Sequence, residues 1–176
     1  MCEGAFQMMK VGLIDSPYNY LEIGVFNGDS ITALATLHPN KMFYGIDPFI
    51  EDGHTVNATG KKCGELMDQQ RETANKNFNS VTNAFLYEVT SKQFADWLYD
   101  KALNWMNIGW VLVDGSHHYE DVKNDLALAV RLIGPRYGAI IVDDMNIAGV
   151  KQAYEEFTGT PYTSGDYIAV HWMNIP

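Results

Sequence analysis

Three aspartates follow apolar stretches of the chain, and their positions predict a cluster of carboxylates. Asp114 comes directly after the apolar run 109–113, and Asp143 and Asp144 come directly after the run 138–142. If both runs are parallel strands of one sheet, their carboxyl ends share one edge of that sheet. Three neighbouring carboxylates repel one another unless a cation or a proton neutralises them.

Such a cluster predicts a site for a hard divalent ion such as Mg²⁺, which prefers oxygen ligands and keeps waters that a substrate can displace. Acting as a Lewis acid, the ion would lower the pKa of a substrate hydroxyl group. The alternative interpretation is that Asp143 or Asp144 only caps the segment that follows it.

Two histidines follow the first of these aspartates and are candidates for a proton acceptor. His117 and His118 lie three and four residues after Asp114. Imidazole titrates near neutral pH, so a histidine close to an acidified hydroxyl group can remove its proton. A histidine in such a loop can equally lie at the surface or cap a helix. We therefore name Asp114 and His117 as candidate catalytic residues, with His118 as the weaker alternative.

A glycine-containing turn earlier in the chain predicts a nucleoside site. The turn reads Glu22-x-Gly24-x-x-x-Gly28-x-Ser30. Glycines let a backbone approach a ligand closely, and the start of the next helix offers N–H groups to a carboxylate. The spacing differs from G-x-G-x-x-G, which disfavours a dinucleotide. The separation between this turn and Asp47 along the chain is typical of an acid that binds the two hydroxyl groups of a ribose. The alternative interpretation is that Asp47 only forms a turn before Pro48.

Alternating strand and helix patterns supply the framework for these residues. Short apolar runs predict strands at 20–25, 42–46, 84–88, 109–113, 138–142 and 167–173. Helical periodicity predicts helices at 30–37, 65–78, 91–99, 119–133 and 147–157, with Ser91 as an N-cap. This alternation is typical of a parallel sheet with helices on both faces. The stretch 51–64 is irregular and is equally compatible with a lid and with a long surface loop.

Composition and charge restrict the class of function. The 176 residues suit one domain, which we expect to span 1–176, and 47% of them are hydrophobic. A net charge of −10 argues against a nucleic-acid-binding surface, which needs clustered Lys and Arg. The sequence shows neither an apolar run long enough to cross a membrane nor the pattern of a signal peptide. Cys2 and Cys63 predict free thiols in a reducing compartment, so we expect a cytoplasmic protein. The sequence leaves open whether the chain forms a homo-oligomer.

Four segments resemble motifs of the class I S-adenosylmethionine-dependent methyltransferases. Leu-Glu-Ile-Gly-Val-Phe-Asn-Gly-Asp-Ser at 21–30 resembles the first motif of that family, and Gly-Ile-Asp-Pro at 45–48 resembles the second. Val-Asp-Gly-Ser-His-His-Tyr-Glu at 113–120, followed by Asp125-Leu126, is similar to the Asp-Gly-x-His-x-Tyr-Glu segment of one subfamily. That subfamily includes metal-dependent sugar O-methyltransferases and cephalosporin-hydroxylase-like proteins, and Ile-Val-Asp-Asp at 141–144 is similar to its acidic pair.

The resemblance implies a Rossmann-like, doubly wound α/β fold whose mostly parallel sheet ends in an antiparallel strand. It also implies a set of cofactor-binding residues: Glu22, Gly24, Val25, Phe26, Gly28, Ser30, Asp47, Pro48, Thr90, Ser91 and Asp114. Glu22, Gly24 and Ser30 would hold the methionine part of S-adenosylmethionine, and Asp47 would bind its ribose. The pair 90–91 would contact the adenine.

These implied roles predict methylation of a hydroxyl group on a small molecule, such as a sugar or a diol. In this prediction Mg²⁺ binds to Asp114, Asp143 and Asp144, and His117 is the general base. An NAD-linked oxidoreductase is a second hypothesis, which the glycine spacing disfavours. A non-catalytic nucleoside-binding module is a third, although a bare scaffold would not need metal ligands and a base. The expected partner is a small-molecule acceptor rather than a nucleic acid or a membrane.

Overall fold

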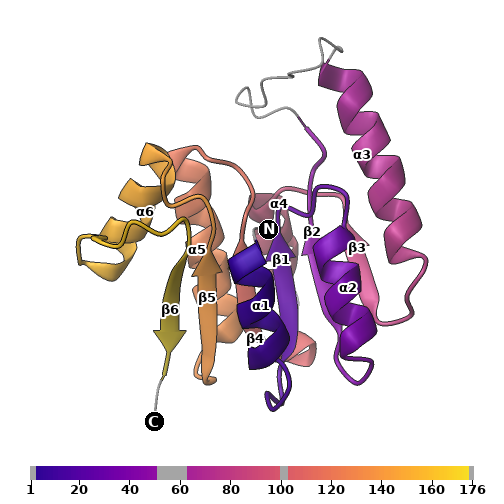
Figure 1. The fold of residues 1–176 in the computed structure, drawn as a ribbon, viewed down its shortest axis with the longest axis horizontal. Helices are drawn as coiled ribbons and strands as arrows, with labels where there is room; N and C mark the ends of the chain where they lie inside the picture. Colours follow the sequence, from indigo (N-terminus) through magenta and orange to yellow (C-terminus); the bar gives the residue numbers. More distant parts are fainter. Residues whose placement is uncertain (1–2, 51–62, 100–102, 175–176) are drawn as a thin grey trace.

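A computed structural model describes residues 3–50, 63–99 and 103–174 of the chain. Within these ranges six strands form one sheet in the order β3-β2-β1-β4-β5-β6 (Figure 1). The strands are β1 (Asn19–Ile23), β2 (Phe43–Ile46), β3 (Ala84–Tyr87), β4 (Ile108–Val113), β5 (Gly138–Val142) and β6 (Ala169–Met173). Neighbouring strands are parallel except β5 and β6, which are antiparallel. This confirms the predicted Rossmann-like, mostly parallel sheet with a final antiparallel strand.

The central strands end level with one another. Ile23 of β1 pairs with Ile46 and with Val113, and Val113 pairs in turn with Val142. The residues that follow them therefore leave the sheet along one edge: Gly24, Asp47, Asp114 and Asp143. The strand order reverses between β1 and β4, and ligands of open parallel sheets bind at such a reversal.

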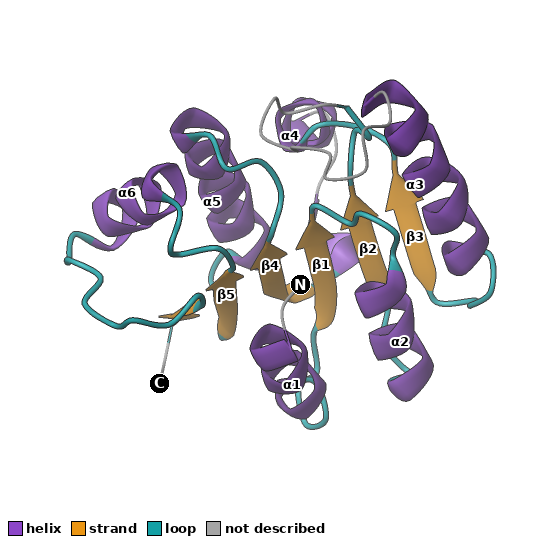
Figure 2. Cartoon of the chain, turned by 45° about the horizontal axis from the view of Figure 1, so that its top comes forward, coloured by secondary structure: helices purple, strands orange, loops and turns teal. Residues whose placement is uncertain are grey.

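Helices cover both faces of the sheet, as predicted. They are α1 (Glu3–Gly12), α2 (Asp29–Leu37), α3 (Cys63–Phe78), α4 (Ser91–Tyr99), α5 (Tyr119–Ile133) and α6 (Ala148–Thr158), with a short 3₁₀ helix η1 (Leu103–Met106). Figure 2 shows α1 and α2 on one face and α4, α5 and α6 on the other. Successive strand residues point to opposite faces. Leu112 therefore packs in the core cluster with residues of α1 and α2, whereas Val113 packs with residues of α4, α5 and α6.

The apolar strand pattern has a simple physical origin. All residues of β4 and β5 are buried, because parallel central strands are covered on both faces. β3 lies at the edge, and Phe85 there remains 42% exposed. None of the described helices is long and apolar enough to cross a membrane.

Some element boundaries differ from the predicted ones. β1 ends at Ile23 rather than at residue 25, because Gly24 turns the backbone into the left-handed region with φ 88°. The last strand begins at Ala169 rather than at residue 167. α3 begins at Cys63, so the end of the stretch predicted to be irregular is helical. The remainder, 51–62, lies outside the described residues.

Two described elements, α1 and η1, are not predicted by the sequence patterns. The first helix places Met9 against the sheet, and Leu13 directly after its end is equally buried. These two residues have the i, i+4 spacing of one helical face. A stretch this short gives a weak periodic signal, so the packing rather than the local pattern reveals it.

Candidate functional site

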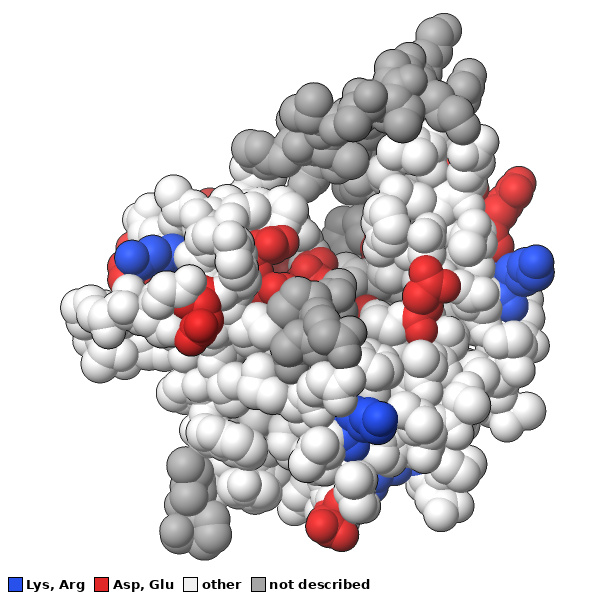
Figure 3. All heavy atoms as spheres, in the orientation of Figure 1, with Lys and Arg blue, Asp and Glu red and all other residues white. Residues whose placement is uncertain are grey.

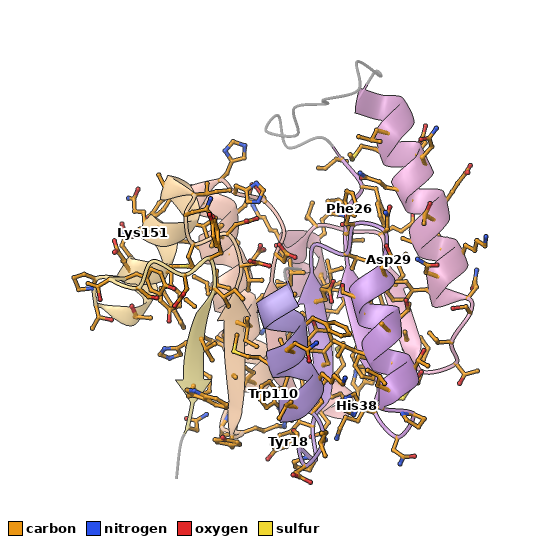
Figure 4. The ribbon with its side chains drawn as sticks, viewed as in Figure 1. Tyr18, Phe26, Asp29, His38, Trp110 and Lys151 are labelled. Carbon is orange, nitrogen blue, oxygen red and sulfur yellow. The ribbon has the colours of Figure 1, made fainter. Side chains whose placement is uncertain are left out.

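The carboxyl edge of the sheet carries most of the predicted site residues. In Figure 3 several acidic side chains gather in the hollow above this edge, between the α5–α6 side and α3. Figure 4 shows Phe26 above the end of β1, while Tyr18, His38 and Trp110 lie towards the opposite end of the sheet. A small pocket at the ends of β4 and β5 is lined by Asp114, His117, Asp143 and Asp144, together with Val113, Gly115, Ser116, Val122 and Val150. The structure thus brings the predicted metal ligands and the predicted base into one pocket.

The first glycine of the turn is needed for contact between two loops. A Cβ atom on Gly24 would lie 2.0 Å from the carbonyl oxygen of Asp114, which is too close for any other residue. Gly24 also has φ 88°, a conformation that L side chains rarely adopt. Gly28, with φ 76°, precedes α2, and its N–H donates to the Val25 carbonyl at 2.9 Å. The β1 loop is therefore held directly against the β4 loop.

Glu22 lies buried at the end of β1 and is held by two hydroxyl groups. Its side chain is 1% exposed. Tyr20 Oη donates to Glu22 Oε2, and Ser30 Oγ donates to Glu22 Oε1, both at 2.8 Å. Burial raises the pKa of the Glu22 carboxyl to about 7, although these two hydrogen bonds oppose the shift. Glu22 and Ser30, predicted to act together, are in contact.

Asp47 joins the loops that follow β1 and β2. The backbone N–H groups of Val25 and Phe26 donate to Asp47 Oδ2 at 2.9 Å each. The N–H of Phe49 donates to Asp47 Oδ1 at 2.7 Å, which closes a turn around Pro48. Asp47 therefore makes the turn that the alternative interpretation expected, while it also lies beside the glycine-containing loop, as a ribose-binding acid requires.

Thr90 and Ser91 are placed at the end of β3, but their side chains contact other protein groups. Thr90 Oγ1 accepts from the Gln93 N–H at 3.1 Å, and Gln93 Oε1 accepts from the Thr90 N–H at 2.9 Å. This reciprocal pair caps α4, so Thr90 and not Ser91 is its N-cap. The Ser91 side chain forms a hydrogen bond with Asp125 of α5.

The three predicted metal ligands share one pocket and interact electrostatically. Burial raises the pKa of the Asp114 carboxyl to about 6, and the charges of Asp143 and Asp144 add to the shift. Asp143 is 5% exposed, and its Oδ1 accepts from the Asp144 N–H at 2.9 Å. Asp144 has φ 58°, an uncommon backbone conformation for a non-glycine residue.

His117 contacts one of these carboxylates. Its Nε2 lies 2.8 Å from Asp144 Oδ2, and both side chains are partly exposed. Among the described residues, no three His, Cys, Asp or Glu side chains are arranged so that they could hold a metal ion. The donors suit Mg²⁺ chemically, since all are carboxylate oxygens, but in this conformation Asp143 Oδ1 and Asp144 Oδ2 contact other protein groups.

Sequence reasoning missed the supporting roles of three residues. The position of Tyr20 could have been predicted, because side chains alternate along a strand and residues two apart, such as Tyr20 and Glu22, share one face. Asp125 lies between Val122 and Leu126 on the apolar side of its helix, a signal for burial, and it is 2% exposed. Gly149 at the start of α6 has no sequence signal: a Cβ there would lie 2.5 Å from the His117 carbonyl oxygen.

Comparison with known proteins gives one family and a group of structural neighbours. A family model described as a methyltransferase domain matches residues 21–145. A candidate caffeoyl-CoA O-methyltransferase from Staphylococcus aureus has a TM-score of 0.67 and 15% identity over 98% of this chain and 84% of its own. A TDP-rhamnose 3'-O-methyltransferase of calicheamicin biosynthesis has a TM-score of 0.56 and 17% identity over 86% of this chain and 68% of its own. No curated protein sequence matches the chain significantly. At these identities the structural likeness shows a common fold.

Proposed function

The chain belongs to the methyltransferase-domain family, and from this premise we propose that it methylates a hydroxyl group of a small molecule with the help of Mg²⁺. Membership of the family makes it an S-adenosylmethionine-dependent methyltransferase, which displaces the oxidoreductase and binding-module hypotheses. One observation carries the finer proposal: His117 and three aspartates line a single pocket beside the glycine-containing loop.

We assign the cofactor to the loops after β1, β2 and β3. Glu22 and Ser30 would receive its methionine part, and Asp47 would bind its ribose through lone pairs that remain on the carboxylate. The adenine would lie near Thr90 and Ser91. Because the hydroxyl groups of these two residues are bonded within the protein, we expect them to shape this part of the site rather than to donate to the base.

The chemistry proposed for the pocket is proton removal followed by in-line attack. An ion held by Asp114, Asp143 and Asp144 would supply Lewis acidity, which lowers the pKa of the acceptor hydroxyl group. His117 takes the proton, and its contact with Asp144 orients the imidazole ring. The acceptor oxygen then forms a bond to the methyl carbon while the carbon–sulfur bond breaks and its electron pair stays on sulfur. The protein contributes mainly orientation and charge stabilisation.

The metal role is tested by removing one charge without removing a hydrogen bond. We expect Asp143→Asn to keep an acceptor for the Asp144 N–H but to lower Mg²⁺-stimulated turnover by roughly 100-fold or more. Turnover is measured with labelled S-adenosylmethionine over a panel of hydroxyl acceptors, with mass detection of the product. Cofactor affinity, from calorimetry, should change little, and Asp15→Asn at an exposed position should behave as wild type.

A metal-independent reaction is the competing mechanism, and the contact between His117 and Asp144 favours it specifically. In that case the two side chains act as a base and its orienting acid, without an ion. Full turnover in excess chelator would reject the metal role and support this pair. Turnover that is lost in chelator and restored by Mg²⁺ would support the proposal. His117→Asn should lower kcat by about 100-fold or more under either mechanism.

A further inference from the structure

The carboxylate of Glu22 is an unusual group at the centre of this fold. It is 1% exposed, and burying a charged group without a partner is costly. Among the residues that the structure describes, no Lys, Arg or His side chain forms an ion pair with it. Its partners are the hydroxyl groups of Tyr20 and Ser30, and the charge of Asp114 repels a charge on Glu22. The site therefore favours the arrival of a cation.

Tyr20 is placed to control this carboxylate. It precedes Glu22 by two residues on the same strand, so both side chains project from one face of β1. Its ring is fully buried and packs against Phe43, with ring centroids 5.7 Å apart. The hydroxyl group donates to Glu22 Oε2, while Ser30 at the start of α2 donates to the other oxygen. The rigid ring thus fixes one oxygen from the strand side, and the helix fixes the other.

We propose that Tyr20 is a positioning residue of the cofactor site, whose hydroxyl group holds Glu22 as an oriented anion that binds the ammonium group of the methionine part of S-adenosylmethionine. This inference rests on the proposed cofactor site. A hydrogen bond to a carboxylate stabilises its charged form, and the ammonium group supplies the positive charge that the described surroundings of Glu22 lack. Tyr20 itself does not touch the cofactor in this assignment.

The proposal has a consequence for pH that a purely structural role of Tyr20 would not have. Burial brings the pKa of the Glu22 carboxyl to about 7, with Tyr20 and Ser30 lowering it and Asp114 raising it. A bound ammonium group favours the charged form, so binding releases a proton and cofactor affinity rises as the pH increases from 6 to 8. Tyr20→Phe removes a donor to the charged form, and the midpoint of this rise should move to higher pH by about one pH unit.

The test is a calorimetric titration with S-adenosylhomocysteine, which carries the same ammonium group and is not turned over. Affinity and proton release are measured between pH 6 and 8.5 for wild type and Tyr20→Phe. We expect Tyr20→Phe to bind about fivefold more weakly at pH 7 and to approach wild type at the upper end of the range. Tyr44→Phe is the matched control, because Tyr44 is a buried tyrosine on the neighbouring strand and belongs to the other core cluster. It should leave the midpoint unchanged.

Equal weakening at every pH, or an unchanged midpoint, would overturn the proposal for Tyr20. If Tyr20→Phe alone does not fold, the same change is made in a Glu22→Gln background, where no buried charge needs the hydroxyl group. There Tyr20→Phe should have no further effect on affinity, and Glu22→Gln should remove the pH dependence. A further loss of affinity in that background would also overturn the proposal. Wild-type protein that binds no S-adenosylhomocysteine at any pH would instead reject the proposed cofactor site.

Discussion

Individual residues at the carboxyl edge of the sheet adopt costly backbone conformations. Phe26, Phe49 and Asp144 are non-glycine residues with φ of 54°, 49° and 58°, and they follow β1, β2 and β5 respectively. Such conformations persist only where the surroundings enforce them, and they concentrate at functional sites. At Phe26 and Phe49 the carboxylate of Asp47 holds the backbone in place, because it accepts hydrogen bonds from both N–H groups. The strain at Phe26 and Phe49 therefore lies where the cofactor is proposed to bind.

At this scale the clearest prediction concerns Gly24. Gly24→Ala should destabilise the protein by about 3 kcal/mol or more, because the added Cβ meets the Asp114 carbonyl oxygen and φ is positive. Gly159→Ala measures the cost of the positive φ alone, because Gly159 has φ 68° and nothing lies within 4 Å of its Cβ position. We expect that control to cost about 1 kcal/mol. Urea unfolding measures both, and equal costs would show that the contact with Asp114 is unimportant.

Whole elements are connected through one buried carboxyl group. Asp125 of α5 is 2% exposed, and it takes a hydrogen bond from Ser91 at the start of α4. Its Oδ2 would lie 3.5 Å from a Cβ on Gly115, in the loop that carries Asp114 and His117. One side chain thus connects two helices and supports the loop of the proposed catalytic residues.

The prediction for this connection is a coupling between two variants. Asp125→Ala and Ser91→Ala should each lower the free energy of unfolding by about 1–3 kcal/mol, because each breaks the hydrogen bond between Ser91 and the buried carboxyl group of Asp125. The double variant should lose less than the sum, since the two side chains share one interaction. Asp96→Ala, at an exposed position of α4, should change stability by less than about 0.5 kcal/mol. Additive losses in urea unfolding would show that Asp125 and Ser91 act independently.

For the molecule as a whole, buried acids determine how stability depends on pH. Burial raises the pKa of Glu22 and of Asp125 to about 7 and that of Asp114 to about 6. These values lie above those of an unfolded chain, so between about pH 4 and pH 7 the folded protein binds more protons than the unfolded one. The contribution of these groups to stability is therefore present at low pH and is lost as the pH rises towards 7.

We accordingly expect the cofactor-free protein to have a higher Tm at pH 5.5 than at pH 8. The net charge of −10 acts in the same direction, because deprotonation adds to repulsion among carboxylates. The asparagine side chain in Asp125→Asn cannot ionise and still accepts a hydrogen bond from Ser91. The Tm of this variant should therefore fall less than that of wild type between pH 5.5 and pH 8. Differential scanning calorimetry at constant ionic strength provides the measurement. A Tm that is constant or rises between these pH values contradicts the assigned shifts.

By itself the sequence determined the class of fold and the edge of the sheet where chemistry occurs. Burial on both faces makes parallel strands into continuous apolar runs, so runs such as 109–113 and 138–142 can be recognised from neighbouring residues alone. Because parallel strands end at the same edge of a sheet, the sequence was enough to predict that Asp47, Asp114 and Asp143 lie at one edge. The family motifs lie at these same ends.

Only the tertiary structure decided what each polar group contacts. Thr90 and not Ser91 caps α4, His117 contacts Asp144, and Gly24 is required by the approach of Asp114. Except for the cap, these partners are separated by many residues along the chain. Periodicity reports whether a residue is buried, but a hydrogen bond depends on atoms that meet within about 3 Å after folding. The buried carboxylate of Glu22 and the hydroxyl group of Tyr20 illustrate the difference: their common strand face could be predicted, and their contact could not.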